Sequence, residues 1–328
     1  MSKKIVVTGG AGFIGAHLVR KLVGLDNNVV VVDNLIRGMA SRIDDLMDKI
    51  TLCNDDIRDE KLMAKAFAGA DVVYHLAAVN GTENFYKRPE LVLDVGVRGA
   101  MSVMNACQIA GVKQVVIAST AEVYQTPEIV PTDETIPLML PDSLNPRYSY
   151  GGSKILTELV AFNYGTDFFD RVQVFRPHNI YGANMGWKHV LPQFIVRALN
   201  GKDKYGTEVP FEIFGTGEET RSFCYVDDVV NGIITMQEKG DHRNIYHIGN
   251  DEEVSMLDVA NMIAKRLDIK LNFEHTDTHA GSTPRRCPSI GKMKKLGYQP
   301  MVNLENGLEK CIDWYKDNRN PPADNELV

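Results

Sequence analysis

A tyrosine and a lysine four residues apart, Tyr150 and Lys154, are the side chains whose types and spacing best suit catalysis. If the stretch YGGSK at 150–154 is helical, both lie on one face of the helix. An ammonium group near a phenol favours the phenolate. It thereby lowers the tyrosine pKa toward neutrality and allows Tyr150 to take a proton from a substrate hydroxyl group. The pair therefore predicts a general base, and an ordinary pair on a helix surface is the alternative.

A glycine-rich loop near the N-terminus is the clearest binding motif. Residues 8–15 read TGGAGFIG, with Gly9, Gly12 and Gly15 at regular spacing between a strand-like run and a helical pattern. The glycines allow a tight turn, a close approach of the backbone to a pyrophosphate, and close helix–strand packing. The N–H groups at the helix N-terminus then face the phosphates. This context predicts a dinucleotide site.

Asp33 ends the second predicted strand, where an acid that binds the adenosine ribose is expected. Its carboxylate can accept hydrogen bonds from both ribose hydroxyls and would repel a 2′-phosphate. We therefore predict NAD rather than NADP, although the nearby Arg37 would suit a phosphate. Asp56 and Ile57, after the third strand, either contact the adenine or form an exposed turn.

Two further polar residues follow the predicted strand at 115–118. Thr120 and Glu122 lie in the segment STAEVY, and the carboxyl end of this strand should lie beside the nicotinamide. The hydroxyl of Thr120 could share a proton path with the substrate oxygen. The alternatives are a strand-end cap for Thr120 and a solvated charge for Glu122.

Alternating strands and helices must position these residues. This alternation predicts an α/β fold, a Rossmann-type doubly wound parallel sheet. After about residue 175, glycines and prolines break the chain into shorter pieces, which we interpret as a smaller C-terminal α/β lobe over a ligand. We expect an NAD-binding domain at 1–175, to which some later segments return, a lobe that mainly binds substrate at 176–320, and a polar tail at 321–328. The expected strands are 5–8, 29–32, 71–75 and 114–118, and the expected helices are 11–23, 60–67, 91–110, 190–200, 226–238, 256–266 and 304–316.

Composition limits the partners and the compartment. The 328 residues carry a net charge of -7, which argues against a nucleic-acid-binding surface but allows local arginines to hold an anionic small molecule. We find no apolar run long enough for a membrane span and no signal-peptide core. Five cysteines without CxxC spacing predict neither a disulfide framework nor a metal site. We expect a cytoplasmic protein.

The sequence resembles the extended short-chain dehydrogenase/reductases, in their nucleotide-sugar epimerase/dehydratase branch. The resemblance implies that Thr120, Tyr150 and Lys154 are the catalytic trio and that NAD stays bound while the sugar passes through a 4-keto intermediate. It also implies a homodimer formed through helices near 98–111 and 150–164. The motifs that carry it are TGGAGFIG (8–15), VVDNL (31–35), DDIRD (55–59), VYHLAA (73–78), STAEVY (119–124), YGGSK (150–154), FRPHNIYG (175–182) and TRSFCYVDD (220–228).

The resemblance also assigns the binding residues. It implies that Asn179 contacts the substrate diphosphate and that Thr120 contacts the sugar. Arg221 is the best candidate for a charge-assisted contact with the diphosphate, and Arg285 is a similar candidate in the C-terminal lobe. Lys154 can also bind the nicotinamide ribose. The expected NAD contacts are Gly9, Gly12, Phe13, Ile14, Gly15, Asp33, Asn34, Asp56, Ile57, Leu76, Ala77, Ala78, Tyr150 and Lys154.

The sequence departs from the family pattern at the position where dTDP-glucose dehydratases carry an aspartate, since this chain has Ala121. Glu122 matches the glutamate of 4,6-dehydratases and UDP-glucuronate decarboxylases, so it is a possible base at C3 or C5. The segment around Lys188 resembles GDP-mannose 3,5-epimerase, in which a lysine here is an acid/base partner. Lys188 is otherwise a loop lysine in solvent or near the substrate phosphates.

We therefore expect an NAD-dependent nucleotide-sugar epimerase or dehydratase that oxidises C4 transiently, with a slight preference for an epimerase. A 4,6-dehydratase, a UDP-glucuronate-type decarboxylase and a net 4-dehydrogenase that releases a 4-keto sugar remain alternatives. A scaffold that senses NAD without turnover is the non-enzyme alternative, which the intact Thr120, Tyr150 and Lys154 disfavour.

Overall fold

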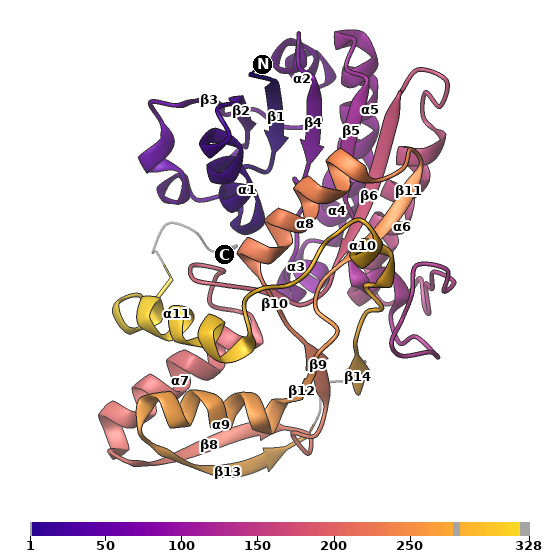
Figure 1. Cartoon of the computed structure of the whole chain (residues 1–328). Helices are drawn as coiled ribbons and strands as arrows, with labels where there is room; N and C mark the ends of the chain where they lie inside the picture. Colours follow the sequence, from indigo (N-terminus) through magenta and orange to yellow (C-terminus); the bar gives the residue numbers. More distant parts are fainter. Residues whose placement is uncertain (1, 278–282, 322–328) are drawn as a thin grey trace.

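A seven-stranded parallel sheet forms the centre of the molecule, which is described by a computed structural model over residues 2–277 and 283–321. The strand order is β11-β6-β5-β4-β1-β2-β3, so the direction of winding reverses between β1 and β4 (Figure 1). Ligands of such sheets bind beyond the carboxyl ends of the strands at this reversal. The strands are β1 (Lys4–Thr8), β2 (Asn28–Val32), β3 (Ile50–Cys53), β4 (Val72–His75), β5 (Gln114–Ala118), β6 (Arg171–Pro177) and β11 (Asn244–Ile248).

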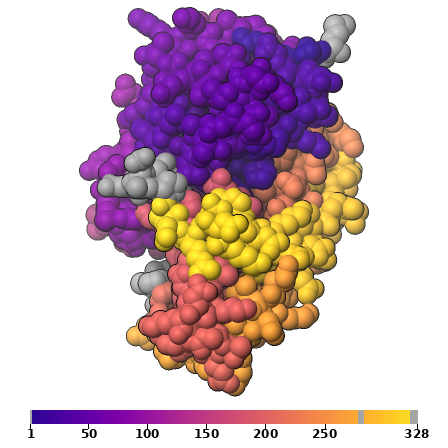
Figure 2. Space-filling model, turned by 90° about the vertical axis from the view of Figure 1, so that its left-hand side faces the viewer, coloured from indigo at the N-terminus to yellow at the C-terminus, as the bar shows by residue number. Residues whose placement is uncertain are grey.

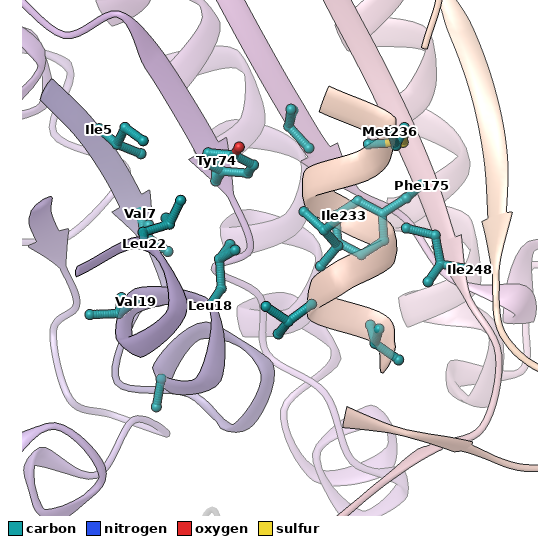
Figure 3. Close-up of a cluster of buried hydrophobic side chains, with 14 of the residues drawn as sticks. Ile5, Val7, Leu18, Val19, Leu22, Tyr74, Phe175, Ile233, Met236 and Ile248 are labelled. Atoms are coloured by element: carbon teal, nitrogen blue, oxygen red, sulfur yellow. The ribbon is translucent and has the colours of Figure 1, made fainter. Parts of the chain in front are cut away.

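Helices cover both faces of this sheet, because the strands are apolar on both sides. In β1, Ile5 and Val7 point into one hydrophobic cluster and Val6 points into the other, as the alternation of a strand requires. Figure 3 shows the first cluster, where Leu18 and Ile233 pack over the sheet from two different helices. The first face is covered by α1 (Phe13–Gly24), α8 (Val226–Lys239) and α10 (Gly291–Lys295), and the second by α2 (Glu60–Phe67), α4 (Pro89–Leu93), α5 (Gly99–Ala110) and α6 (Ser149–Asn163).

The helix expected at 91–110 is interrupted. A π-helical turn, Asp94–Arg98, separates α4 from α5. Within this turn a Cβ at Gly96 would lie 2.7 Å from the Ser153 hydroxyl, and the Gly96 carbonyl accepts a hydrogen bond of 3.0 Å from Thr157. The glycine and the irregular turn therefore let α6 pack closely at the level of the residues predicted to be catalytic.

The smaller lobe has a hydrophobic core of its own. Strand β8 is buried at every second residue, and its Val209, Phe211 and Ile213 face the helices of the lobe. In Figure 2 the yellow atoms, which include α11 (Leu304–Asp317), lie between the indigo N-terminal residues and the rest of the lobe. The lobe contains α7 (Val190–Tyr205), β8 (Glu208–Phe214) paired with β13 (Lys270–Thr276), α9 (Met256–Leu267) and α11 (Leu304–Asp317).

Short strands connect the lobe to the sheet. Strand β7 (Ile180–Tyr181) pairs with β10 (Cys224–Tyr225), and β9 (Thr220–Ser222) lies between β12 (Glu253–Ser255) and β14 (Arg285–Arg286). After β10 the chain returns to the central sheet through α8 and β11. The predicted fold class is thus confirmed, with a doubly wound parallel sheet and a smaller α/β lobe. No helix of the described ranges combines the length and apolar character needed to cross a bilayer.

Candidate active site

Two neighbouring cavities lie at the carboxyl ends of the strands. The larger has a volume of about 610 Å³ and extends to the smaller lobe, and the smaller has a volume of about 100 Å³ beside β2. Both are bordered by the glycine loop and by the segment after β4. The residues that line both cavities are Gly9, Gly12, Arg37, Leu76 and Ala78.

The glycine loop leaves no space for side chains. Gly9 has a φ of +72°, and a Cβ there would lie 2.7 Å from the backbone nitrogen of Ala77. A Cβ at Gly15 would overlap the carbonyl oxygen of Gly9. Helix α1 begins at Phe13 without a side-chain cap, so its first N–H groups are open to a phosphate. This backbone cradle fits the pyrophosphate of a dinucleotide.

Asp33 lies in the smaller cavity and is held by the backbone. Its carboxylate accepts hydrogen bonds of 2.9 Å from the N–H groups of Ala11 and Leu35. Burial raises the pKa of Asp33, and these two hydrogen bonds oppose that shift. A Cβ at Gly38 would lie 2.6 Å from one carboxylate oxygen, so this glycine packs directly on the acid. The carboxylate is thus fixed at the position expected for the adenosine ribose.

The other residues predicted to bind adenosine line the same cavity. Asn34 donates a hydrogen bond of 3.2 Å to Asp56. Hydrogen bonds from Arg58 lower the pKa of Asp56 and so favour its carboxylate. Ile57 and Ala77 supply apolar wall on either side. Phe13 and Ile14, which are also predicted NAD contacts, line the larger cavity instead.

Tyr150 and Lys154 come from α6 and line the larger cavity together with Thr120. Only 8% of Tyr150 and 2% of Lys154 is exposed, so water has little access to either group. The Tyr150 ring stacks on Phe85 with 5.2 Å between ring centroids, and its hydroxyl is hydrogen-bonded to Thr120. The ammonium of Lys154 donates a hydrogen bond of 2.8 Å to the Ala118 carbonyl at the end of β5.

Burial dominates the acid–base properties of this pair. It raises the pKa of Tyr150, an effect that the nearby Glu122 increases and that the Thr120 hydrogen bond and Arg37 oppose. Burial also lowers the pKa of Lys154 to about 8, against the influence of Glu158. The expectation that Lys154 brings the tyrosine pKa toward neutrality is therefore wrong, because desolvation dominates and Lys154 is not among the groups that shift the pKa of Tyr150.

Glu122 and Lys188 line the same cavity, each with an ion-pair partner. Glu122 lies 2.9 Å from the guanidinium of Arg147, and about one fifth of each side chain is exposed. Lys188 lies 2.8 Å from Glu83 and is half exposed. The cavity therefore brings together the two groups that the sequence suggested as proton-transfer partners, and Lys188 is the more solvated of the two.

The three residues predicted to bind the substrate diphosphate lie in different environments. Asn179 lines the larger cavity and donates a hydrogen bond of 3.0 Å to the Ser222 carbonyl. Arg221 instead donates to the carbonyls of Thr220 and Thr283, at 2.7 and 2.6 Å. Arg285 pairs with Glu253 at 2.5 Å and is half exposed. Neither of these two arginines, both in the described part of the chain, borders the cavity.

Three residues that the sequence reading did not assign belong to the site. Arg286 lines the cavity, and its Nε atom is buried without a hydrogen-bond partner. Arg147 holds Glu122, and Gly38 packs on Asp33. Arg286 could have been suspected from the sequence, because it stands beside Arg285. The contacts of Arg147 and Gly38 form only through the tertiary fold.

The chain is similar to several known nucleotide-sugar enzymes. The putative UDP-glucose 4-epimerase of Methanocaldococcus jannaschii is 30% identical, over 96% of this chain and 99% of the relative. UDP-N-acetyl-alpha-D-glucosaminuronate decarboxylase of Bacillus cytotoxicus is 31% identical, over 98% and 100%. The structure of the dTDP-glucose 4,6-dehydratase of Streptomyces venezuelae, solved with NAD bound, has 28% identity and a TM-score of 0.84, over 96% of this chain and 98% of the other.

The family assignment follows. A second structure, the UDP-glucose 4-epimerase of Thermotoga maritima with UDP-glucose, is 28% identical with a TM-score of 0.85, over 97% of this chain and 100% of the other. The model of the NAD dependent epimerase/dehydratase family matches residues 5–249. The predicted resemblance, the enzyme class and the NAD cofactor are thereby confirmed. This chain, with its glycine cradle and buried Tyr150 and Lys154, belongs to the NAD dependent epimerase/dehydratase family.

Proposed function

We propose that the protein binds a nucleotide-diphosphate sugar and oxidises it transiently at C4, before a proton is moved at a neighbouring carbon. One observation carries this proposal: Thr120, Glu122 and Tyr150 line a single cavity that also contains the glycine loop. The cavity volume of about 610 Å³ suits a ligand of this size. Arg286 and Asn179 border the cavity and are the groups best placed to hold the diphosphate.

Tyr150 is the base in the first step. The glycine loop and Lys154 would hold NAD in this cavity, where the cofactor would supply the acceptor for the hydride of C4. Tyr150 takes the proton of the C4 hydroxyl, and Thr120 shares a hydrogen bond with that oxygen. Lys154 keeps a positive charge close by below about pH 8. Because the pair is buried, the hydride and the proton are shielded from water.

Glu122 is the base in the second step. A ketone at C4 acidifies the hydrogens on C3 and C5, so a carboxylate in the same cavity can remove one of them. Arg147 holds the Glu122 carboxylate in place through an ion pair of 2.9 Å. Lys188, released from Glu83, would return a proton from the other side of the ring, which favours an epimerase slightly over a 4,6-dehydratase.

A decarboxylase is the second candidate, and the comparisons favour it. The Bacillus cytotoxicus relative, which this chain matches over its whole length, is named as a uronate decarboxylase. A 4-keto uronate is a β-keto acid, which loses CO2 without a base at C5. Glu122 would then act only when the product is protonated. A net 4-dehydrogenase is the remaining enzyme alternative.

Proton NMR in heavy water separates these reactions. The purified protein is incubated with UDP-, GDP-, CDP- and dTDP-sugars, including uronates. Deuterium at C3 or C5 with retention of all carbons supports the epimerase or dehydratase, and release of CO2 supports the decarboxylase. Inversion at C4 without exchange indicates a plain 4-epimerase. Accumulation of NADH indicates the net dehydrogenase, and absence of any reaction with every sugar contradicts the proposal.

Replacing Glu122 with glutamine tests the second step. We expect Glu122→Gln to retain reduction of NAD by the substrate and to slow deuterium entry at C3 or C5 by roughly 100-fold to 10,000-fold, the usual contribution of a general base. Both rates can be followed in one reaction by absorbance and NMR. The matched control is Glu128→Gln, since Glu128 is an exposed glutamate in the chain segment that follows Glu122. Unchanged exchange in Glu122→Gln would remove Glu122 from the mechanism.

We also propose a homodimer in the cytoplasm. Helices α5 and α6 pack beside each other and expose Ile109, Leu156 and Leu159, with exposed fractions of 64%, 44% and 55%. Exposed apolar side chains on neighbouring helices favour association with a second copy.

The five free cysteines favour a reducing compartment, which supports the proposed location in the cytoplasm.

Leu159→Glu is expected to convert the dimer into a monomer, because it places a charge in the proposed interface. Light scattering after size-exclusion chromatography measures the mass directly. Leu144→Glu is the control, since Leu144 is 91% exposed on a loop outside α5 and α6. A wild-type protein that is monomeric at high concentration would rule the dimer out.

A further inference from the structure

The segment that follows Asp33 lies over the glycine loop. The Met39 N–H donates a hydrogen bond of 3.0 Å to the Ala11 carbonyl, which fixes this segment to the loop. Its far end reaches the smaller lobe, because Arg42 donates a hydrogen bond of 2.9 Å to the Asn184 carbonyl. This segment carries two arginines, Arg37 and Arg42, and both line the larger cavity together with the glycine loop.

Arg37 has an unsatisfied positive charge. Its Nη1 atom is buried without a hydrogen-bond partner, and within the described ranges it has no carboxylate in ion-pair contact. Burial lowers the pKa of Arg37, opposed by the Tyr150 hydroxyl. Burial, and after it the charge of Arg37, lower the pKa of Arg42 to about 10, so the two cations are close to each other. A buried guanidinium without an acid is unfavourable unless an anion binds to it.

The position of Arg37 indicates which anion this is. Arg37 borders both cavities, together with Gly9 and Gly12 of the loop. One cavity contains Asp33 for the adenosine ribose, and the other contains Tyr150 beside the expected nicotinamide. In a dinucleotide the two nucleosides are joined by a diphosphate, so the group that bridges the two cavities is this diphosphate.

We propose that Arg37 binds the diphosphate of NAD, with Arg42 as a second positive charge, and thereby retains the cofactor in the protein. The two arginines match the two negative charges of the diphosphate, and the N-terminus of α1 supplies N–H groups to the same oxygens. This role differs from recognition of a 2′-phosphate, because Asp33 occupies the ribose end of the smaller cavity. It rests on the NAD cofactor and does not depend on which sugar is converted.

Calorimetric titration of Arg37→Gln with four probes tests this proposal. NAD and ADP-ribose contain the diphosphate, adenosine contains only the ribose and base, and UDP represents the substrate. We expect affinities for NAD and ADP-ribose to fall by roughly 10- to 100-fold, the effect of losing a charge-assisted contact. Affinities for adenosine and UDP should stay within about twofold. The amount of NAD released on denaturing the purified variant should fall as well.

Two further variants complete the experiment. Arg37→Lys keeps the charge without the planar fork and should bind ADP-ribose with intermediate affinity. Arg98→Gln is the control, because Arg98 is 69% exposed outside both cavities, and its affinities should match those of the wild type. If Arg37→Gln fails to fold, Arg37→Lys still decides the question. Weaker UDP binding with unchanged ADP-ribose binding would assign Arg37 to the substrate, and no change with any probe would contradict an anion site; either result overturns the proposal.

Discussion

Tyr150→Phe is expected to lower turnover by roughly 100-fold to 10,000-fold, while NAD remains bound. The substitution removes only the hydroxyl group, because the phenylalanine ring can keep the stack on Phe85 that has 5.2 Å between ring centroids. The lost hydroxyl is also the hydrogen-bond partner of Thr120. Because packing should change little, a large loss of turnover in this variant would be due to the loss of proton transfer by Tyr150.

Three measurements separate chemistry from folding and from cofactor loss. Turnover is measured with the nucleotide sugar identified by NMR, bound NAD is quantified after denaturation, and the melting temperature reports stability. Tyr86→Phe is the matched control, since Tyr86 is 52% exposed on α3 (Thr82–Lys87). Turnover close to wild type in Tyr150→Phe would exclude Tyr150 as the base. Loss of NAD from the variant would instead show that the hydroxyl is needed for binding.

The cofactor loop could be predicted from the sequence because its geometry is local. A turn with positive φ at Gly9 and close packing at Gly15 follow from the glycine spacing alone, and the structure has both. The parallel sheet was predictable for a similar reason, because each buried strand is a short apolar run next to a helical pattern. The interrupted helix was not, since the π-helical turn serves the packing of Gly96 against Ser153.

The arginines show where such prediction fails. Arg285 and Arg286 are neighbours on β14, so their side chains point to opposite sides of the strand. The register of β14 decides which arginine faces the cavity, because a shift of one residue would exchange the two sides. This register is set by the pairing of Arg286 with Arg221 on β9. The pKa of Tyr150 was mispredicted for a related reason, because burial is a property of the assembled site and outweighs the attraction of a nearby charge.

Mild acid is expected to destabilise the folded protein strongly. Three histidines, His75, His178 and His247, are buried, and a fourth, His189, is partly exposed in the wall of the larger cavity. Burial is the largest cause that lowers the pKa of each. The pKa is about 3 for His75 and His247, about 4 for His189, and well below the usual value for His178. In the unfolded chain a histidine has a pKa of about 6.5. The folded state thus excludes protons that the unfolded state binds.

The stability contributed by these neutral imidazoles is fully present above about pH 6.5 and is lost as the pH falls below that value. Between pH 7.5 and pH 5.5, each of the three buried histidines removes up to roughly 1.3 kcal/mol, so the three together remove up to about 4 kcal/mol. The buried Asp33 acts in the opposite direction, since burial raises its pKa, but the ordinary pKa of an aspartate is 3.8, so Asp33 contributes mainly at lower pH.

Urea unfolding at the two pH values, at one fixed NAD concentration, measures this difference. His247→Gln should reduce the pH-dependent part of the unfolding free energy by about 1.3 kcal/mol, whatever its effect on stability at pH 7.5. His275→Gln is the control, because His275 is exposed and should leave the pH dependence unchanged. Equal unfolding free energies at pH 7.5 and pH 5.5 would mean that the buried imidazoles accept protons in the folded state. Since His247 is hydrogen-bonded to Tyr124 at 2.6 Å and lies against His178, such a result would require this buried cluster to open before the rest of the protein unfolds.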